Sequence, residues 1–344
     1  MNQDRSNLSE RAVVFGAGSW GSALAHLLAS KGVPTSIWSF SEQEACQLSQ
    51  ERTLPSKLPG FSLHKDIVIS SKLDLLLENA TVLVFAVPSC FTRSTAVQVG
   101  QALGDRARGC CVVSASKGFE METLKSMSTV LGEELDTPSL VALSGPTHAE
   151  EVVLGLPTTV VAASRRMEAA CRAQSLFMAP SFRVYTSEDV LGVELGGALK
   201  NLVAIAAGAA AGMGFGDNTM AALVTRGLAE ITRLGVAMGA DPLTFSGLSG
   251  LGDLVVTCAS RHSRNRRLGI ALAAGKTLDE ALKEIGMVVE GVEMARSVKS
   301  LVQRYGVEMP IAVQVAETLF EGVPVKEAVR ALMLRDPKPE VQIL

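Results

Sequence analysis

Aromatic residues are scarce in this chain of 344 residues, at 4% of the sequence. A core with so few rings must be packed from aliphatic side chains, and hydrophobic residues make up 47% of the chain against 19% charged. An excess of charge is also missing: the formal net charge of −3 gives no basic face of the kind that nucleic-acid binding usually needs. The most apolar helical run, residues 202–213, is shorter than the roughly 20 residues of a membrane span. We therefore expect a globular protein with no nucleic-acid partner and no membrane span.

Metal-ligand and disulfide patterns are missing too. The six cysteines form no CxxC pair and the four histidines show no ligand spacing, so we expect no metal site. We expect all six cysteines to be small buried side chains in a reducing compartment. The polar first eleven residues contain no apolar segment of the kind found in secretory signals. Together these features predict a cytoplasmic protein.

Short β-branched runs alternate with amphipathic segments through the first half of the chain. The expected strands are residues 12–15, 35–38, 67–70, 82–87, 111–115, 140–144, 159–162 and 183–185. Most of these runs are continuously apolar, which is typical of strands covered by helices on both faces. Their alternation with helices predicts an α/β fold: a Rossmann-type, doubly wound and mostly parallel sheet.

The pattern changes after residue 187, where helical periodicity takes over. The expected helices are residues 189–212, 218–238, 265–274, 278–285, 292–305, 311–320 and 325–334, with several prolines near their starts and glycines near their ends. The length of the chain favours two domains. We expect a dinucleotide-binding domain over residues 8–190, an all-helical substrate-binding and catalytic domain over residues 191–334, and a disordered tail over residues 335–344.

A glycine-rich turn joins the first expected strand to the first expected helix. It reads Gly16-Ala-Gly18-Ser-Trp-Gly21. In this strand–turn–helix context Gly16 permits the tight turn, Gly18 lets the backbone approach a pyrophosphate, and Gly21 lets the helix pack on the strand. The free N–H groups of the helix N-terminus then face the phosphates. The motif predicts a nicotinamide dinucleotide site.

The end of the second strand bears on the choice of cofactor. A site selective for NAD usually places Asp or Glu there to bind the ribose 2′-hydroxyl. This chain reads Trp38-Ser-Phe-Ser-Glu42, with no acid at the expected place. No arginine is adjacent either, although Arg52 or Lys57 could reach back from the next loop. We expect a site that accepts NADP or NAD, with a modest preference for NADPH.

Polar residues interrupt apolar or glycine-rich sequence at three further places. They are Ser116-Lys117-Gly118, Lys200-Asn201, and Gly250-Leu-Gly-Asp253 followed by Ser263-Arg-Asn-Arg-Arg267. The first follows a strand, at the edge where open α/β sheets bind ligands. The glycines at 192, 196 and 197 precede the second within two helical turns and allow another backbone or a cofactor to come close.

Lys200 is the candidate proton donor to a carbonyl oxygen. That role needs its pKa to fall from about 10.4 to about 7–8. Burial and cationic neighbours, for which Lys117 and Arg264 are candidates, would lower it, and Asp253 would orient the ammonium. The alternative is a lysine that simply reaches the helix surface. Arg264 and Asn265 have the donors that a phosphate needs, or they form an arginine-rich surface helix start.

Taken together, the stretches GAGSWG, ASKG, SGPTHAEE, GGALKN, GLGDL, SRNRR and VVEG closely resemble the NAD(P)-dependent sn-glycerol-3-phosphate dehydrogenase family, and they extend over most of the chain. The resemblance implies a cofactor site, a substrate site and a catalytic lysine, Lys200. Implied cofactor contacts are Gly16, Gly18, Ser19, Trp20, Gly21, Phe40, Lys117, Ala149, Arg264, Val288 and Glu290. Implied substrate contacts are Lys117, Gly145, Thr147, Lys200, Asn201, Asp253, Thr257, Ser263, Arg264 and Asn265. Phe40 departs from the basic or histidine residue that the family often has there, which bears on cofactor preference and not on the reaction.

The reaction implied by the resemblance is reversible hydride transfer from NAD(P)H to dihydroxyacetone phosphate, giving sn-glycerol 3-phosphate, a phospholipid precursor. A β-hydroxyacid dehydrogenase is an alternative, which the SRNRR and GLGDL segments argue against. A non-catalytic dinucleotide sensor would give the polar residues at 117, 200 and 253 no role. A homodimer is expected because closed two-fold assemblies are the commonest.

Overall fold

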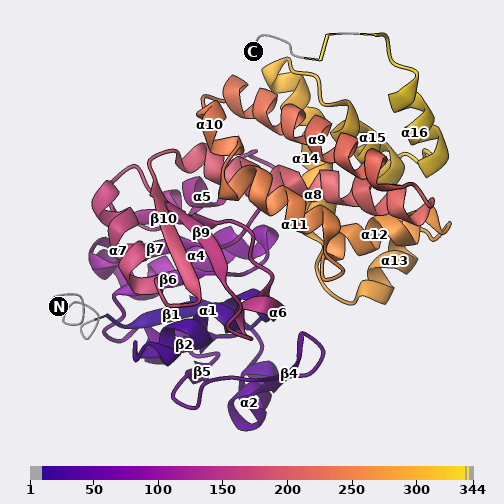
Figure 1. The fold of residues 1–344 in the computed structure, drawn as a ribbon. Coiled ribbons are helices and arrows are strands. Elements are labelled where there is room, and N and C mark those ends of the chain that lie inside the picture. The colour runs from indigo at the N-terminus through magenta and orange to yellow at the C-terminus, as the bar shows by residue number, and fades with distance from the viewer. Residues whose placement is uncertain (1–9, 338, 341–344) are drawn as a thin grey trace. The chain divides into compact units, whose positions relative to one another are not determined.

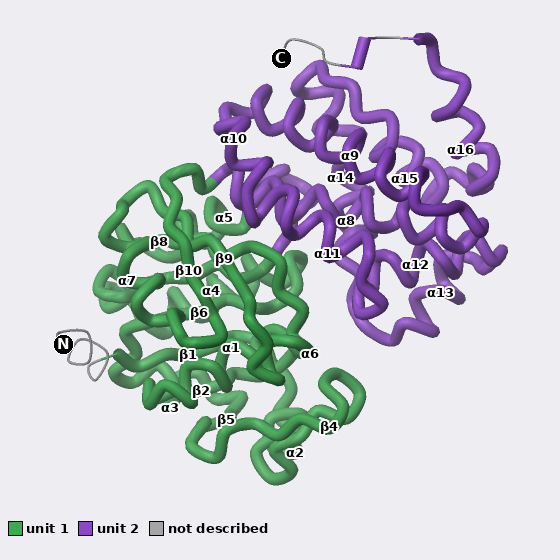
Figure 2. Tube along the Cα trace, viewed as in Figure 1, with its two compact units in different colours: residues 1–116, 127–190 green, residues 117–126, 191–344 purple. Residues whose placement is uncertain are grey.

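The computed structural model describes residues 10–337, 339 and 340, which fall into two compact units (Figure 1, Figure 2). The first unit comprises residues 1–116 and 127–190, and the second comprises residues 117–126 and 191–344. The chain thus enters the second unit briefly at residues 117–126, before its main crossing after Val190. Part of the expected disordered tail, residues 338 and 341–344, lies outside the described residues, as do residues 8 and 9 of the expected first domain.

The first unit is built on an eight-stranded sheet. In spatial order its strands are β10 (Phe182–Ser187), β9 (Thr158–Ala163), β8 (Leu140–Ser144), β7 (Cys111–Ser114), β6 (Val82–Phe85), β1 (Ala12–Phe15), β2 (Thr35–Trp38) and β5 (Val68–Ser70). Neighbouring strands run parallel except β8 and β9, which are antiparallel. The chain winds outward in one direction from β1 to β2 and β5, then in the other from β6, so the switch point lies between β1 and β6. The predicted Rossmann-type fold class is confirmed.

Both faces of this sheet are buried, as the continuously apolar strands predicted. In β1, Ala12 and Val14 belong to one hydrophobic cluster, while Val13 and Phe15 belong to a second cluster on the opposite face. The helices of this unit are α1 (Ser19–Ser30), α2 (Glu42–Glu51), α3 (Leu73–Leu77), α4 (Thr92–Leu103), α5 (Met127–Glu134), α6 (Ala149–Val152) and α7 (Met167–Phe177), with 3₁₀ turns at Ser89–Phe91 and Gly104–Gly109.

A short hairpin interrupts the alternation of strands and helices. It pairs β3 (Thr53–Leu54) with β4 (Leu58–Ser62) in antiparallel fashion. The sequence did not predict it, because Pro55, Pro59 and Gly60 break the β pattern. Its turn contains Lys57, which the hairpin carries to the glycine-rich turn.

The second unit is helical. Its helices are α8 (Val190–Gly212), α9 (Asp217–Ala237), α10 (Pro242–Phe245), α11 (Asp253–Ala259), α12 (Arg264–Ala273), α13 (Leu278–Ile285), α14 (Glu290–Tyr305), α15 (Pro310–Phe320) and α16 (Val325–Met333), with a π-helical turn at Leu248–Gly252. The predicted helices are present, with ends shifted by at most two residues. The sequence reading did not include α10, the π-helical turn or α11, because their glycines resembled a loop.

Helix α8 forms the centre of the second unit's core. It has the length and mean hydropathy, 1.5, that a membrane span requires, yet 83% of its most apolar window is buried inside the protein. A bent pair, Pro242–Ala259 with Arg264–Ala273, meets the same criteria of length and composition. The buried residues of α8 belong to the core of the second unit. A helix that other helices cover on all sides is expected to be apolar around its whole circumference.

The expectation that all six cysteines are buried is wrong for three of them. Cys110, Cys111 and Cys258 are buried, whereas the remaining three, at positions 46, 90 and 171, are exposed. The exposed ones lie on the solvent-facing sides of α2, the first 3₁₀ turn and α7, which the spacing of cysteines alone does not indicate. All six are free thiols.

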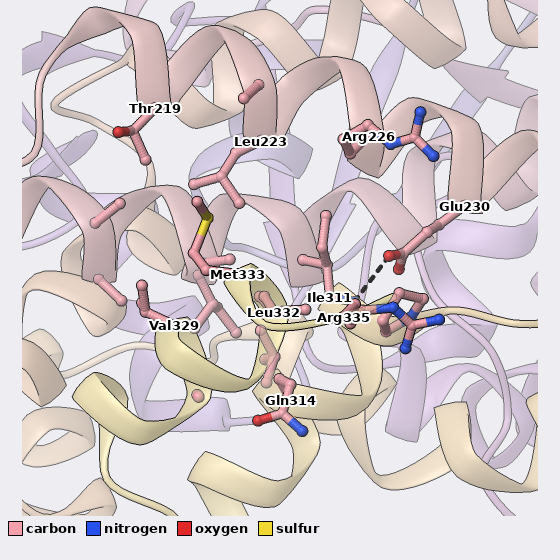
Figure 3. A pocket seen from close by; sticks show the side chains of 18 of the residues that line it. Thr219, Leu223, Arg226, Glu230, Ile311, Gln314, Val329, Leu332, Met333 and Arg335 are labelled. Carbon is pink, nitrogen blue, oxygen red and sulfur yellow. Dashed lines mark hydrogen bonds between the residues drawn. The ribbon is translucent and has the colours of Figure 1, made fainter. Parts of the chain in front are cut away.

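The second unit contains an apolar cavity of about 510 Å³. Helices α8, α9, α15 and α16 contribute its lining, which includes Leu223, Val329 and Met333 (Figure 3). Glu230 of α9 also lines it, and its carboxylate accepts hydrogen bonds from the backbone N–H groups of Ile311 (2.8 Å) and Ala312 (3.1 Å). The buried glutamate therefore caps the N-terminus of α15, whose first residue is a proline.

Candidate active site

The glycine-rich turn has the geometry that the sequence required. Gly16 has φ +113°, and a Cβ there would lie 2.8 Å from the carbonyl oxygen of Ala86. A Cβ at Gly21 would lie 2.1 Å from the carbonyl oxygen of Gly16. Neither position tolerates a side chain, because the backbone just after β6 and the backbone of the turn itself occupy the space.

Gly18 differs from these two glycines, because a Cβ there would meet nothing within 4 Å. The open space lies at the N-cap of α1, where the first N–H groups of the helix have no intrahelical partner. Beside it, the indole Nε1 of Trp20 is buried and has no hydrogen-bond partner among the described residues. An open cradle, a helix N-terminus and an unsatisfied donor fit the pyrophosphate of a dinucleotide. Ser19, the other expected contact in the turn, donates its hydroxyl to the Lys57 carbonyl oxygen (3.1 Å).

The end of β2 carries no acid of its own, and Phe40 is 82% exposed. Of the two cations expected to reach back, Arg52 instead donates to the carbonyl oxygen of Ile67 (2.6 Å). Lys57 reaches the glycine-rich turn, donating to the carbonyl oxygen of Ala17 (3.3 Å), and forms an ion pair with Glu44 (2.5 Å). Sequence reasoning did not select Glu44 as a site residue.

Three expected substrate or cofactor contacts lie on the loop after β8 in the first unit. Gly145 has φ +142°, and a Cβ there would be 3.0 Å from the carbonyl oxygen of Thr159. The Thr147 hydroxyl donates to the carbonyl oxygen of Gly145 (3.0 Å), and Ala149 is the buried first residue of α6. The loop at the carboxyl end of β8 is therefore held by a bond from the Thr147 side chain to its own backbone.

Lys117 belongs to the second unit, although it directly follows the first unit's Ser116. Its segment folds back through an isolated bridge between Phe119 and Ser126, and the buried Phe119 belongs to the helical core. This anchor fixes the position of Lys117, whose ammonium donates to Asp253 Oδ2 (2.7 Å). Phe119 is a positioning residue that the sequence reading did not identify.

Lys200 lies in the middle of α8, and its ammonium bonds to two side chains of α11. It pairs with Asp253 Oδ1 and donates to Thr257 Oγ1 (2.7 Å), and all three side chains are buried. Thr257 in turn donates to the backbone carbonyl oxygen of Asp253 (2.6 Å). One carboxylate thus joins two lysines, because Asp253 uses one oxygen for Lys200 and the other for Lys117.

The close approach of α8 to the π-helical turn brings this cluster together. A Cβ at Gly196, one turn before Lys200, would lie 2.5 Å from the carbonyl oxygen of Ser249. Only glycine allows this contact, and the turn leads directly into Asp253 at the start of α11. The sequence prediction that glycines on this helix admit a second backbone is confirmed at this position.

The pKa of Lys200 is lowered to about 8. Burial is the largest cause and the charge of Lys117 acts in the same direction, while Asp253 opposes the shift. Burial alone would raise the pKa of Asp253, but the two lysines hold it below its usual value. The Asp253 carboxylate is therefore charged at neutral pH. Lys200, with a pKa of about 8, can lose its proton close to neutral pH. Arg264, the other cation proposed to lower this pKa, is not among the causes of the shift.

Asn201 and Asn265 form a second polar cluster next to this lysine. The Asn265 amide donates to Asn201 Oδ1 (2.8 Å), and its oxygen accepts from the backbone N–H of Gly291 (3.0 Å). Ser263 is the N-cap of α12 and accepts from the Arg266 backbone N–H (3.2 Å). These bonds fix the side-chain amides that the sequence assigned to the substrate.

Arg264 is the first residue of α12. Its guanidinium donates to the carbonyl oxygen of Val288 (2.7 Å), just before Glu290 begins α14. The structure therefore brings together three of the residues expected to contact the cofactor: Arg264, Val288 and Glu290. Within residues 10–337, 339 and 340, no cluster of His, Cys, Asp and Glu has the arrangement to hold a metal ion.

Comparisons with known proteins show which family the chain belongs to. The family model of the NAD-dependent glycerol-3-phosphate dehydrogenase N-terminus matches residues 11–170, and that of the C-terminus matches residues 189–330. The chain belongs to this family. It is 50% identical over 331 residues to glycerol-3-phosphate dehydrogenase [NAD(P)+] of Fusobacterium nucleatum, with 96% of this chain and 98% of the relative covered. The corresponding enzyme of Agathobacter rectalis is 49% identical over 330 residues, with 96% and 97% covered.

A solved structure shows the same fold. The crystal structure of glycerol-3-phosphate dehydrogenase from Coxiella burnetii is 34% identical and covers 95% of this chain and 100% of its own, with a TM-score of 0.91. As a member of this glycerol-3-phosphate dehydrogenase family, the chain is an oxidoreductase that uses NAD or NADP. The glycine-rich turn falls within the N-terminal family match, and Lys200, Asp253 and Arg264 fall within the C-terminal match.

Proposed function

We propose that this protein catalyses reversible hydride transfer between NAD(P)H and dihydroxyacetone phosphate, giving sn-glycerol 3-phosphate for glycerophospholipid synthesis. The relatives at 50% and 49% identity carry the name of this activity. The observation that carries the chemistry is a buried lysine with a pKa lowered to about 8, held by one carboxylate and one hydroxyl. A reduced nicotinamide, when bound, supplies the hydride to C2 of the ketone.

Lys200 donates the proton in this proposal. As C2 accepts the hydride, negative charge develops on its oxygen, and the Lys200 ammonium transfers a proton to that oxygen. A donor with a pKa near the working pH is suited to this step, because it gives up the proton readily and recovers it from solvent. In the reverse direction, neutral Lys200 takes the proton from the hydroxyl group.

Asp253 and Lys117 set the charge around this step. The cluster of Lys117, Lys200 and Asp253 carries a net charge of +1 when Lys200 is protonated, which favours an anionic substrate. After Lys200 loses its proton, the pair of Asp253 and Lys117 is neutral. Thr257 and Asp253 fix the direction of the Lys200 ammonium, so that its proton is oriented before the substrate arrives.

We propose that Arg264 and Asn265 recognise the substrate phosphate at the start of α12. A helix N-terminus, a guanidinium and an amide together favour a dianion. Gly145, Thr147, Asn201 and Ser263 are proposed to complete the substrate site, and Ala149, Val288 and Glu290 to contact the cofactor.

The decisive assay mixes the purified protein with NADPH and dihydroxyacetone phosphate and follows absorbance at 340 nm. Oxidation of NADPH that requires the phosphorylated ketone supports the proposal. Activity on a β-keto acid in place of this ketone would indicate a β-hydroxyacid dehydrogenase. Binding of NADPH without turnover of either substrate would indicate a dinucleotide sensor.

We also propose a homodimer in the cytoplasm. Closed two-fold assemblies are the commonest form of soluble oligomers. Light scattering coupled to size-exclusion chromatography should give a mass twice that of the 36.1 kDa chain. A mass equal to one chain at micromolar concentration would contradict the dimer.

A further inference from the structure

The carboxyl ends of β1 and β2 lie side by side at the edge of the sheet where the dinucleotide domain reads the adenosine ribose. The two strands pair in parallel with Phe15 opposite Trp38. The glycine-rich turn follows β1, and the residue after β2 is the usual place for an acid that selects NAD. In this chain Ser39 occupies that place.

A carboxylate nevertheless reaches this position from α2. The Ser39 hydroxyl donates to Glu44 Oε2, so the glutamate's side chain turns back to the end of β2. The side chain of Glu44 is 39% exposed, which leaves it accessible to a ligand.

At the start of α2, Glu44 does not make the side-chain bond that would complete a capping box. Ser41 is the N-cap and accepts from the Glu44 backbone N–H (3.2 Å), the first half of a capping box. In a capping box the glutamate would bond back to the N-cap N–H. Here the Ser39 hydroxyl accepts the hydrogen bond from the Ser41 N–H (3.3 Å). The Glu44 carboxylate bonds to Ser39 and Lys57 instead.

Lys57 brings a positive charge to the same place. Its ammonium donates to Glu44 Oε1 (2.5 Å) and to the carbonyl oxygen of Ala17 in the glycine-rich turn (3.3 Å). Its own carbonyl oxygen accepts from the Ser19 hydroxyl (3.1 Å), so the hairpin and the turn are tied together in both directions. The Lys57 side chain is 30% exposed.

We propose that Glu44 and Lys57 are the residues that select the cofactor, with Glu44 binding the ribose 2′-hydroxyl of NAD and Lys57 binding the 2′-phosphate of NADP. This inference rests on the proposed use of a nicotinamide dinucleotide. The two side chains have opposite effects on NADP binding: the Glu44 carboxylate repels the 2′-phosphate, and the Lys57 ammonium attracts it. The pair therefore explains a site that accepts both cofactors, whereas an unpaired acid would exclude NADP.

The test measures dissociation constants for NADPH and NADH by calorimetric titration of the full chain, with no substrate present. The wild-type protein should bind both, with constants within about tenfold of each other. Glu44→Gln should shift the ratio about tenfold or more toward NADPH, because the phosphate no longer faces a carboxylate. Lys57→Gln should shift it about tenfold or more toward NADH, since a charge-assisted contact to the phosphate is lost.

Matched controls make the same changes nearby. Glu42→Gln removes an acid from the first turn of the same helix, and Lys65→Gln removes an exposed lysine after the same hairpin. Neither should move the ratio more than about twofold. Lys57→Arg keeps the positive charge and should retain NADPH binding, which separates loss of charge from loss of fold.

The outcomes distinguish this inference from the proposed function. Wild-type protein that binds both dinucleotides, with ratios unchanged in Glu44→Gln and Lys57→Gln, would overturn the inference alone. Parallel weakening of both cofactors in these variants would also overturn it, because a pair that only supports the hairpin has that effect. Wild-type protein that binds neither dinucleotide would overturn the proposed function and this inference with it.

Discussion

Lys200 and Asp253 lie 53 residues apart in the chain, and their side chains form a buried ion pair between α8 and α11. The carboxylate is shared with Lys117, so two like charges are held close together through one acid. Breaking a buried pair by removing one partner is costly, because it leaves an uncompensated charge. The arrangement also ties the protonation of Lys200 to both neighbours, and three predictions follow from that dependence.

The first prediction concerns the replacement of Lys200. Lys200→Ala should lower kcat by about 10²-fold to 10⁴-fold, the usual contribution of a positioned acid, while the dissociation constant of NADPH changes little. Steady-state kinetics and a separate NADPH titration measure the two effects. Lys326→Ala, at an exposed lysine on α16, is the matched control and should keep wild-type kinetics. A Lys200→Ala variant with more than about a tenth of the wild-type kcat would show that another group supplies the proton.

The pH dependence of the two reaction directions should be opposite. Ketone reduction needs protonated Lys200, whose pKa is about 8 in place of the ordinary value of about 10.4. The value of kcat/KM for reduction should therefore be constant below about pH 7 and fall above about pH 8. For oxidation of glycerol 3-phosphate it should rise over the same range. Profiles with no break between pH 7 and 9 in either direction would argue against Lys200 as the acid and base.

Asp253→Asn should move that break to lower pH. Asp253 raises the pKa of Lys200, so removing its charge leaves burial and Lys117 to lower the pKa unopposed. A shift of about one pH unit or more in the reduction profile is expected, and activity at pH 7.5 should fall accordingly. Thr257→Val removes a hydrogen-bond acceptor of Lys200 without changing charge, and should move the break much less. If the Asp253→Asn variant does not fold, Asp253→Glu can be measured instead. Because glutamate keeps the negative charge, its pH profile should break at the same pH as that of the wild type.

The sequence predicted the sheet and the glycine-rich turn well, because both depend on local patterns. Four apolar residues at 12–15 followed by three spaced glycines permit few alternatives to a strand, a turn and a helix. The antiparallel pairing of β9 with β8 was not predictable in this way, because the residues of a strand do not show in which direction it runs within the sheet. Helices α10 and α11 were missed because Gly247, Gly250 and Gly252 indicate a loop, although Gly250 of the π-helical turn packs closely against the backbone of Phe245.

The polar site was predictable in part. Lys200 was detectable because a charge among small and apolar residues on a helix is unusual. That Asp253 would bond to Lys117 and Lys200 at once depends on tertiary geometry that no spacing reveals. Glu44 gave one usable signal, the Ser41-x-x-Glu44 pattern of a capping box. The pattern predicts a helix start, whereas the turn of Glu44 toward Ser39 depends on Lys57, which arrives from a hairpin that the sequence did not reveal.

Glu230 allows a prediction about stability that is separate from the active site. Burial raises its pKa to about 7, although the N–H groups of Ile311 and Ala312 oppose the shift. Figure 3 shows the bond between Glu230 and Ile311. Because the folded-state pKa lies above the unfolded value of about 4.3, the folded protein retains the proton more strongly. Stability should therefore decrease as pH rises from about 5 to 7.5, by about 2.5 kcal/mol from this residue.

Glu230→Gln should remove that part of the pH dependence, since an amide does not ionise. Thermal unfolding followed at pH 5 and pH 7.5 measures the difference for each protein. Glu327→Gln, at an exposed residue of α16, is the control and should retain the wild-type dependence. An equal change in the unfolding midpoint between the two pH values for wild type and Glu230→Gln would mean that Glu230 does not titrate in this range.

Arg264 should recognise the phosphate group of the substrate. Arg264 opens α12, next to Asn265 in the chain, and its guanidinium bonds to the Val288 carbonyl oxygen. The N-terminus of a helix favours an anion. A charge-assisted contact to a phosphate contributes about 1.5–3 kcal/mol, so Arg264→Ala should lower kcat/KM for dihydroxyacetone phosphate by about 10-fold to 150-fold. Arg264→Lys should restore only part of this, because an ammonium cannot form the two parallel bonds of a guanidinium.

The informative quantity for Arg264 is the ratio of kcat/KM for dihydroxyacetone phosphate to that for unphosphorylated dihydroxyacetone. If Arg264 binds the phosphate, the ratio should fall sharply in Arg264→Ala, because only the phosphorylated substrate loses a contact. Arg261→Ala, at an exposed arginine just before the same helix, is the matched control and should keep the wild-type ratio. The NADPH dissociation constant should change less than the ratio does. A fall in NADPH affinity as large as the loss of turnover would instead assign Arg264 to the cofactor, and the phosphate would then be sought at Lys117 and Asn265.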